Sequence, residues 1–221
     1  MAIDYTKRKP ATTGTPAKGG LAKVTLTKAS PTVSLSKQTG QLRVNLNWDA
    51  QPPAAKQGGL LKRLTAGRGI DLDLGCLYEL ADGTKGVVQA LGNAFGHLDQ
   101  PPYILLSGDD RSGASSGGED LFVNLAHAAK IRRVLVFACI YDGASNFDQA
   151  KGVVTLTPAN GPSIEVRLDE QAGASRMCAI ALLEGNGSDL TVRREVRYVD
   201  GAQDALDREY GWGMKWARGR K

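Results

Sequence analysis

Residues 107–120, with the sequence SGDDRSGASSGGED, gather four carboxylates in a stretch made mostly of glycine and serine. Carboxylate and carbonyl oxygens are the ligands that hard cations prefer, and Ca²⁺ takes about six to eight of them. Glycine lets the backbone turn tightly enough to present its carbonyl oxygens to an ion. The stretch is therefore one candidate half of a divalent-cation site, with the acids Asp109, Asp110, Glu119 and Asp120.

Two familiar motifs have a similar spacing, and neither fits. The segment that starts at Gly108 has the spacing of a phosphate-binding P-loop, but Ala114 stands where that motif needs a lysine. The segment from Asp109 to Asp120 has the length of an EF-hand loop, but several of its ligand positions carry the wrong residue types. The sequence therefore points to a cation loop of another kind.

Two other acidic elements could complete such a site. In the segment IDLDLG, Asp71 and Asp73 alternate with leucines, so in a strand both carboxylates point to one face while the leucines point to the core. Carboxylates that close repel each other unless a cation or water separates them. The most apolar segment, RVLVFACIYD, ends in Asp142. The alternative is that all these acids are ordinary turn and loop residues, which segments rich in Asp, Gly and Ser often carry.

Short segments with apolar residues at every second position would hold these acids in place. Alternation of this kind is typical of half-buried strands, and a short continuous apolar run is typical of a central strand. Only residues 201–212 show the spacing of a helix. We expect strands within 22–28, 31–37, 41–48, 70–80, 101–108, 121–125, 133–142, 152–158, 163–170, 176–184 and 190–199.

This pattern predicts an all-β fold, a two-sheet β-sandwich with a short C-terminal helix. The chain of 221 residues, 42% of them hydrophobic, is long enough to bury a full core as one domain. We expect residues 1–20 to form a flexible basic N-terminal tail and residues 21–200 to form the sandwich. Residues 201–221 are expected to form the helix and a basic tail.

The charge of the chain is unevenly distributed. The net charge is +5, but the stretch from Asp71 to Asp120 carries nine acids and two bases. An acidic centre in a basic protein favours a cation site there. The basic tails and the stretch 56–68 could contact nucleic acid, an anionic membrane surface or an acidic protein, or could simply be solvated.

The sequence does not indicate an enzyme. His97 and His127 are the two histidines, and neither lies in a recognisable catalytic setting. Cys76, Cys139 and Cys178 stand singly in apolar segments, as buried thiols in a reducing compartment do. The N-terminus lacks the apolar core of a secretory signal, and the apolar runs are too short to span a bilayer. We predict a non-catalytic, cytoplasmic protein, with a metal-dependent phosphoesterase as a weaker alternative.

The order of these motifs resembles the TerD-domain family of tellurium-resistance and bacterial stress-response proteins. NWDA, IDLDLG, the acidic loop, VLVFACIYD and NFDQ follow one another as the corresponding family segments do, over about residues 21–200. The ending AQDALDREYGWGMKWARGRK is similar to that of the TerA-like branch. The resemblance implies a cytoplasmic β-sandwich that binds Ca²⁺, acts with other stress-response or resistance proteins in an assembly, and has no established catalytic activity.

The resemblance also implies which residues bind the metal. Tyr141 stands where the family has histidine, and the family's GDGDDE portion is SSGGED here, with two acids fewer. Fewer charged ligands usually weaken Ca²⁺ binding, so an interaction scaffold with a degenerate metal site is the alternative function. Such a scaffold would bind partners, anionic lipid or nucleic acid through its basic surface. The implied metal residues are Asp71, Asp73, Asp109, Asp110, Glu119, Asp120 and Asp142.

Overall fold

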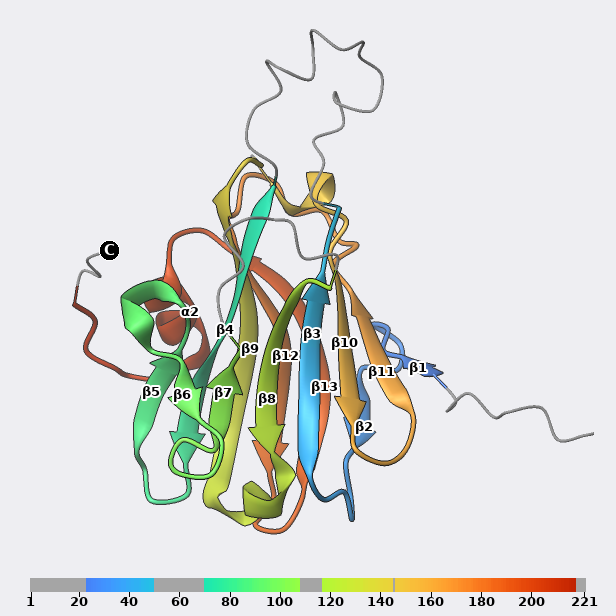
Figure 1. The fold of residues 1–221 in the computed structure, drawn as a ribbon. Helices are drawn as coiled ribbons and strands as arrows, with labels where there is room; N and C mark the ends of the chain where they lie inside the picture. The colour runs from blue at the N-terminus through green and yellow to red at the C-terminus, as the bar shows by residue number, and fades with distance from the viewer. Residues whose placement is uncertain (1–22, 50–69, 108–116, 145, 218–221) are drawn as a thin grey trace, which may run out of the picture.

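The computed structural model describes residues 23–49, 70–107, 117–144 and 146–217. These residues form two β-sheets that pack face to face, with the seven-stranded sheet in front in Figure 1. The predicted fold, an all-β two-sheet sandwich with a short C-terminal helix, is confirmed. In order across the sheet, the front strands are β1 (Lys23–Thr25), β11 (Ser163–Arg167), β10 (Val153–Pro158), β3 (Gln41–Asn47), β8 (Glu119–Asn124), β7 (Ile104–Leu106) and β6 (Gly96–His97).

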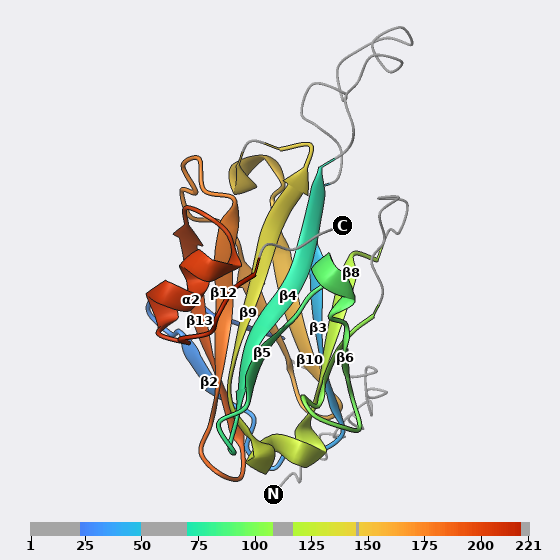
Figure 2. The same ribbon diagram turned by 90° about the vertical axis from the view of Figure 1, so that its left-hand side faces the viewer.

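The six-stranded sheet forms the second layer. Its centre is β9, which lies between β12 and β4, as its apolar sequence predicted. Figure 2 shows helix α2 (Gln203–Tyr210) lying against the outer side of this sheet. In order, its strands are β2 (Thr32–Ser34), β13 (Leu190–Val199), β12 (Met177–Gly185), β9 (Ile131–Asp142), β4 (Asp71–Leu80) and β5 (Lys85–Val88).

Alternation along the strands produces the core between the sheets. In β3, Leu42, Val44 and Leu46 are fully buried, while Arg43 and Asn45 lie on the outer face of the seven-stranded sheet. In β8, the inward positions are Glu119, Leu121 and Val123. An acid therefore occupies an inward position at the start of β8, where alternation alone would favour an apolar residue.

The six-stranded sheet buries its outer face as well, which explains why β9 and β12 are continuously apolar. A second apolar cluster covers that face and includes Leu77, Leu135, Phe137, Met177 and Trp212. Its cover is the C-terminal segment, which we define as residues 203–217, comprising α2 and the extended stretch after it. Gly211 caps the C-terminal end of helix α2, and its φ of 62° is in the left-handed region that glycine adopts without strain. Trp212 is fully buried against this face of the sheet.

The sequence analysis did not predict the two short strands β5 and β6. The four residues of β5 show no alternation, and β6 has only two residues. Short helical turns complete the described fold at Leu91–Asn93 (η2), Leu125–Lys130 (η3) and Phe147–Gln149 (η4). Among the described residues, no helix is long and apolar enough to cross a membrane.

Gly75 in β4 provides a test of the packing on the outer face. A Cβ atom at this position would lie 2.7 Å from Cζ of Phe137 and 2.9 Å from the carbonyl oxygen of Val88. Because one of these neighbours is backbone, we expect Gly75→Ala to lower the free energy of unfolding by about 2 kcal/mol, the usual cost of overpacking. Urea denaturation measures this change, and an unchanged midpoint would show that β4 and its neighbours β9 and β5 shift without cost.

Candidate metal site

The acids of the segment IDLDLG lie at the start of β4 in the six-stranded sheet, beside the end of β9. Asp71 pairs with Asp142 across the two strands, and Asp73 pairs with Cys139. The register slips by one residue between Asp71 and Leu72, so a β-bulge separates the two pairs. Both aspartates are half-buried, and the leucines between and after them are in the core. The structure therefore brings three of the predicted acids to one end of two neighbouring strands.

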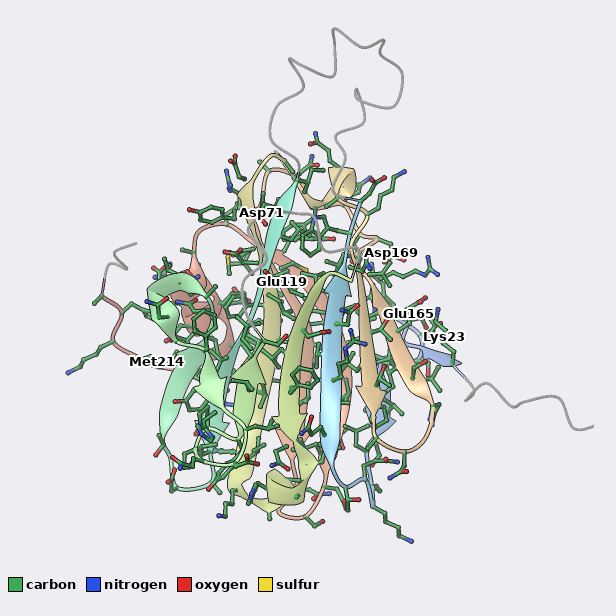
Figure 3. The ribbon with its side chains drawn as sticks, viewed as in Figure 1. Lys23, Asp71, Glu119, Glu165, Asp169 and Met214 are labelled. Carbon is green, nitrogen blue, oxygen red and sulfur yellow. The ribbon has the colours of Figure 1, made fainter. Side chains whose placement is uncertain are left out.

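Glu119 reaches this end of β4 from the other sheet. Its side chain is 4% exposed, and its Oε2 accepts a hydrogen bond of 2.6 Å from the backbone N–H of Leu74. Leu74 follows Asp73 directly, so Glu119 lies beside the aspartates although it belongs to β8. Figure 3 shows Asp71 and Glu119 on the same upper part of the sandwich. Glu119 thus contacts the backbone of the strand that carries Asp71 and Asp73.

The pKa of the Cys139 thiol reflects the negative charge of this region. Burial, together with the negative charges of Asp73 and Glu119, raises the pKa of its thiol to about 12. A thiol with so high a pKa is almost wholly protonated near neutral pH and is a poor nucleophile. Cys76 and Cys178 are buried, and burial raises the pKa of both thiols as well. The expectation of buried thiols holds for these two, whereas Cys139 is partly exposed.

Asp120 does not join the group. Arg43 holds its carboxylate at two points, with Nε 2.7 Å from Oδ1 and Nη2 2.9 Å from Oδ2. The amide nitrogen of Asn45 donates to the same Oδ1 at 2.8 Å. Successive residues of a strand point to opposite faces, so Asp120 faces outward where its neighbour Glu119 faces inward. The structure places this predicted ligand on the outer face of the seven-stranded sheet, paired with arginine.

The remaining predicted ligands, Asp109 and Asp110, lie outside the described residues. Within the described ranges, no three His, Cys, Asp or Glu side chains are arranged closely enough to hold a metal ion. The described acids nevertheless offer oxygen donors of the type that Ca²⁺ takes, with no imidazole or ionised thiol among them. The donor chemistry of Asp71, Asp73, Glu119 and Asp142 therefore fits a hard divalent cation.

Sequence analysis missed the residues that hold these acids in place. Trp48 donates its indole N–H to the carbonyl oxygen of Ile70 at 2.8 Å, which fixes the entry into β4. Arg43 and Asn45 alternate on the outer face of β3, but which strand pairs with β3 could not be read from the sequence. A signal existed only for Trp48, because it ends the alternating segment 41–48.

The two histidines have structural contacts. His97 lies in β6, and its Nδ1 accepts backbone hydrogen bonds from Asp99 and Gln100. His127 lies in η3 and stacks on the ring of Tyr103, with 4.3 Å between ring centroids. Both contacts stabilise the turns at the end of the sandwich that contains η3.

Comparisons with known proteins identify relatives of the chain. No family model matches it. The curated tellurium resistance protein TerA of Alcaligenes sp. is 45% identical over 207 residues, which cover 92% of this chain and 60% of that protein. The chain therefore spans 60% of the length of this relative.

Solved structures share the fold. A homologue of telluride resistance protein (TerD) from Streptomyces coelicolor A3(2) superposes with a TM-score of 0.51 at 21% identity. The match covers 76% of this chain and 95% of that one. A second solved structure, of a protein described as of unknown function, has a TM-score of 0.52 at 18% identity and covers 76% of this chain and 96% of its own.

Proposed function

We propose that this chain, which is 45% identical to a curated tellurium resistance protein TerA and has the fold of the TerD-like proteins, is a non-catalytic, Ca²⁺-binding stress-resistance protein of the TerA-like branch. In this proposal it acts in the cytoplasm together with other resistance or stress-response proteins. The motif resemblance described above is confirmed by the relatives. The cation, the assembly and the absence of catalysis are parts of the proposal.

One observation carries the cation site. Asp71 and Asp142 occupy directly opposite positions on β4 and β9, and Glu119 is anchored to the same stretch of β4. Like charges at directly opposite positions of two strands are destabilising. A divalent cation bound among them would offset this repulsion, and Asp73 lies two residues after Asp71 on the same strand. The described residues proposed to hold the ion are Asp71, Asp73, Glu119 and Asp142, and Asp109 and Asp110 are assigned to it by the family resemblance alone.

The role of the ion in this proposal is structural. An ion that binds only the folded state stabilises it by RT ln(1 + [Ca²⁺]/Kd), which is about 2.7 kcal/mol at a hundredfold excess over Kd. It would fasten β4, β9 and β8 at one end of the sandwich, where the two sheets already meet through Glu119 and Leu74. A partner that recognises this end would then bind only the cation-loaded protein.

We expect Ca²⁺ to raise the thermal midpoint of the wild-type protein and Asp71→Asn to weaken that effect. The substitution removes one charge at nearly constant shape, so it lowers the affinity for the ion. It should also stabilise the metal-free protein by about 0.5 kcal/mol, because one cross-strand repulsion is gone. Calorimetric titration and thermal unfolding in chelator measure the two effects.

Asp82→Asn is the matched control for this experiment. Asp82 lies in the turn before β5, where its Oδ1 accepts a hydrogen bond of 2.9 Å from the backbone N–H of Thr84. Its substitution should leave the Ca²⁺ affinity unchanged. If millimolar Ca²⁺ does not move the thermal midpoint of the wild type, the cation proposal is wrong and the interaction scaffold becomes the better hypothesis.

A further inference from the structure

Ser107 and Gly117, the described residues nearest each other across the segment 108–116, are both fastened to the seven-stranded sheet. At one end, the backbone N–H of Ser107 donates to the carbonyl oxygen of Asp120 at 2.9 Å, and its hydroxyl donates to the same oxygen at 3.2 Å. At the other end, the amide nitrogen of Asn45 donates to the carbonyl oxygen of Gly117 at 2.7 Å. The same nitrogen also contacts the Asp120 carboxylate. A single side chain of β3 therefore ties together the start of β8 and the residue at which the segment returns.

The backbone at the start of β8 has little freedom. Gly118 has a φ of 71°, and a Cβ atom there would lie 2.0 Å from the carbonyl oxygen of Leu46. Only glycine allows β8 to approach β3 this closely. From this point the register is set, with Glu119 opposite Leu46 and Asp120 opposite Asn45. The direction of each side chain at the start of β8 follows from that register.

Holding Asp120 also determines where Glu119 points. The two residues are neighbours on one strand, so their side chains project to opposite faces. Arg43 and Asn45 keep the Asp120 carboxylate on the outer face. Glu119 then projects inward and reaches the backbone N–H of Leu74, next to Asp73. A continuous set of contacts thus leads from Arg43 on the outer face to the acids of β4.

We propose that Arg43 and Asn45 are positioning residues of the cation site, which set its affinity by holding Asp120 and Gly117 so that Glu119 is presented to β4. This inference rests on the proposed function. Asp120 itself then acts as part of the positioning contacts and contributes no ligand oxygen. Second-layer partners of this kind typically change metal affinity about 10- to 100-fold when they are removed.

The charge of Arg43 makes the test decisive. If Arg43 acted only through its long-range charge, removing a positive charge near an anionic site would tighten the binding of a cation. If Arg43 acts by positioning Glu119, the same substitution weakens binding. The two explanations predict opposite signs, so a merely electrostatic role cannot imitate the expected result.

The experiment compares Ca²⁺ affinities of full-length variants by calorimetric titration. Arg43→Met and, separately, Asn45→Ala should weaken binding about tenfold. Arg167→Met is the matched control, because Arg167 is also an outer-face arginine of the seven-stranded sheet and its partner Glu165 keeps a second partner in Lys23. Terbium luminescence sensitised by Trp48, whose indole contacts Ile70 beside Asp71, gives an independent reading. Thermal unfolding in chelator shows that each variant is folded at the temperature of titration.

A double-mutant cycle identifies the route of the effect. If Arg43 acts through Asp120, Arg43→Met should cost little further affinity in an Asp120→Asn background, because contacts within one network are not additive. Wild-type protein that binds no Ca²⁺ overturns the cation site and this inference together. Wild-type binding that is unchanged or tighter in Arg43→Met and Asn45→Ala overturns the inference and leaves the cation site standing.

Discussion

Trp212→Ala is expected to lower the free energy of unfolding by about 4 kcal/mol, within the range of 3 to 5 kcal/mol for buried tryptophan. Trp212 is fully buried in the outer cluster of the six-stranded sheet. Its indole N–H donates to the carbonyl oxygen of Tyr78 at 3.0 Å, and the Arg133 guanidinium lies 3.8 Å from the ring centroid. The substitution removes the packing, the hydrogen bond and the cation–π contact together.

Urea denaturation monitored by circular dichroism measures the loss. Tyr141→Ala is the control, because Tyr141 is 45% exposed and its removal should change stability by less than about 0.5 kcal/mol. A loss below about 1 kcal/mol for Trp212→Ala would mean that the C-terminal segment is not docked in solution. Near-ultraviolet circular dichroism of the two variants would then distinguish local undocking from unfolding.

Asp207→Ala should have the second-largest effect, a loss of about 3 kcal/mol. Asp207 is 5% exposed and accepts hydrogen bonds from the backbone N–H groups of Gly213 and Met214 and from the indole of Trp216, at 2.7, 2.9 and 2.8 Å. Each donor left without a partner costs about 1–3 kcal/mol when buried, and partial access to water reduces the sum. Chemical denaturation gives the value.

Asp204 provides the matched control in the same helix. It is exposed and pairs with Arg208 one turn later, with 2.7 Å between Nη1 and Oδ2. Pairs of this kind contribute about 0.3–0.5 kcal/mol, so Asp204→Ala should hardly change the free energy of unfolding. Equal losses in the two variants would show that helix α2 is stabilised by its charges and that Asp207 does not organise the stretch after it.

The sequence predicted the parts of the fold that depend on local alternation. In β3, Leu42, Val44 and Leu46 share one face in both the sequence pattern and the structure. The apolar run of β9 indicated a central strand, but not that its outer face would be covered by the C-terminal segment. That cover depends on Asp207, Arg133 and their partners, which are far apart in sequence and carry no local signal.

The candidate site shows the same limit. Asp71 and Asp73 were expected on one face of a strand. In the structure both are half-buried in β4, and each pairs with a residue of β9, Asp71 with Asp142 and Asp73 with Cys139. Asp120 was grouped with Glu119 because they are adjacent in sequence. Adjacent residues of a strand point to opposite faces. The sequence analysis placed both residues in a loop, so it did not predict that their side chains would separate. The partner strand β3, which decides where Asp120 points, could be identified only from the three-dimensional pairing.

The pairing of β1 and β2 with strands much later in the chain affects how the protein folds during synthesis. Strand β1 pairs with β11, with Val24 opposite Ile164, and β2 pairs with β13, with Val33 opposite Val192. Contacts between residues so far apart in sequence give a high contact order, and folds of this type form in milliseconds to seconds. A ribosome that adds about 5–20 residues per second exposes β1 and β2 for several seconds before their partners emerge. Strands β1 and β2 must therefore wait, unpaired, until β11 and β13 have been synthesised.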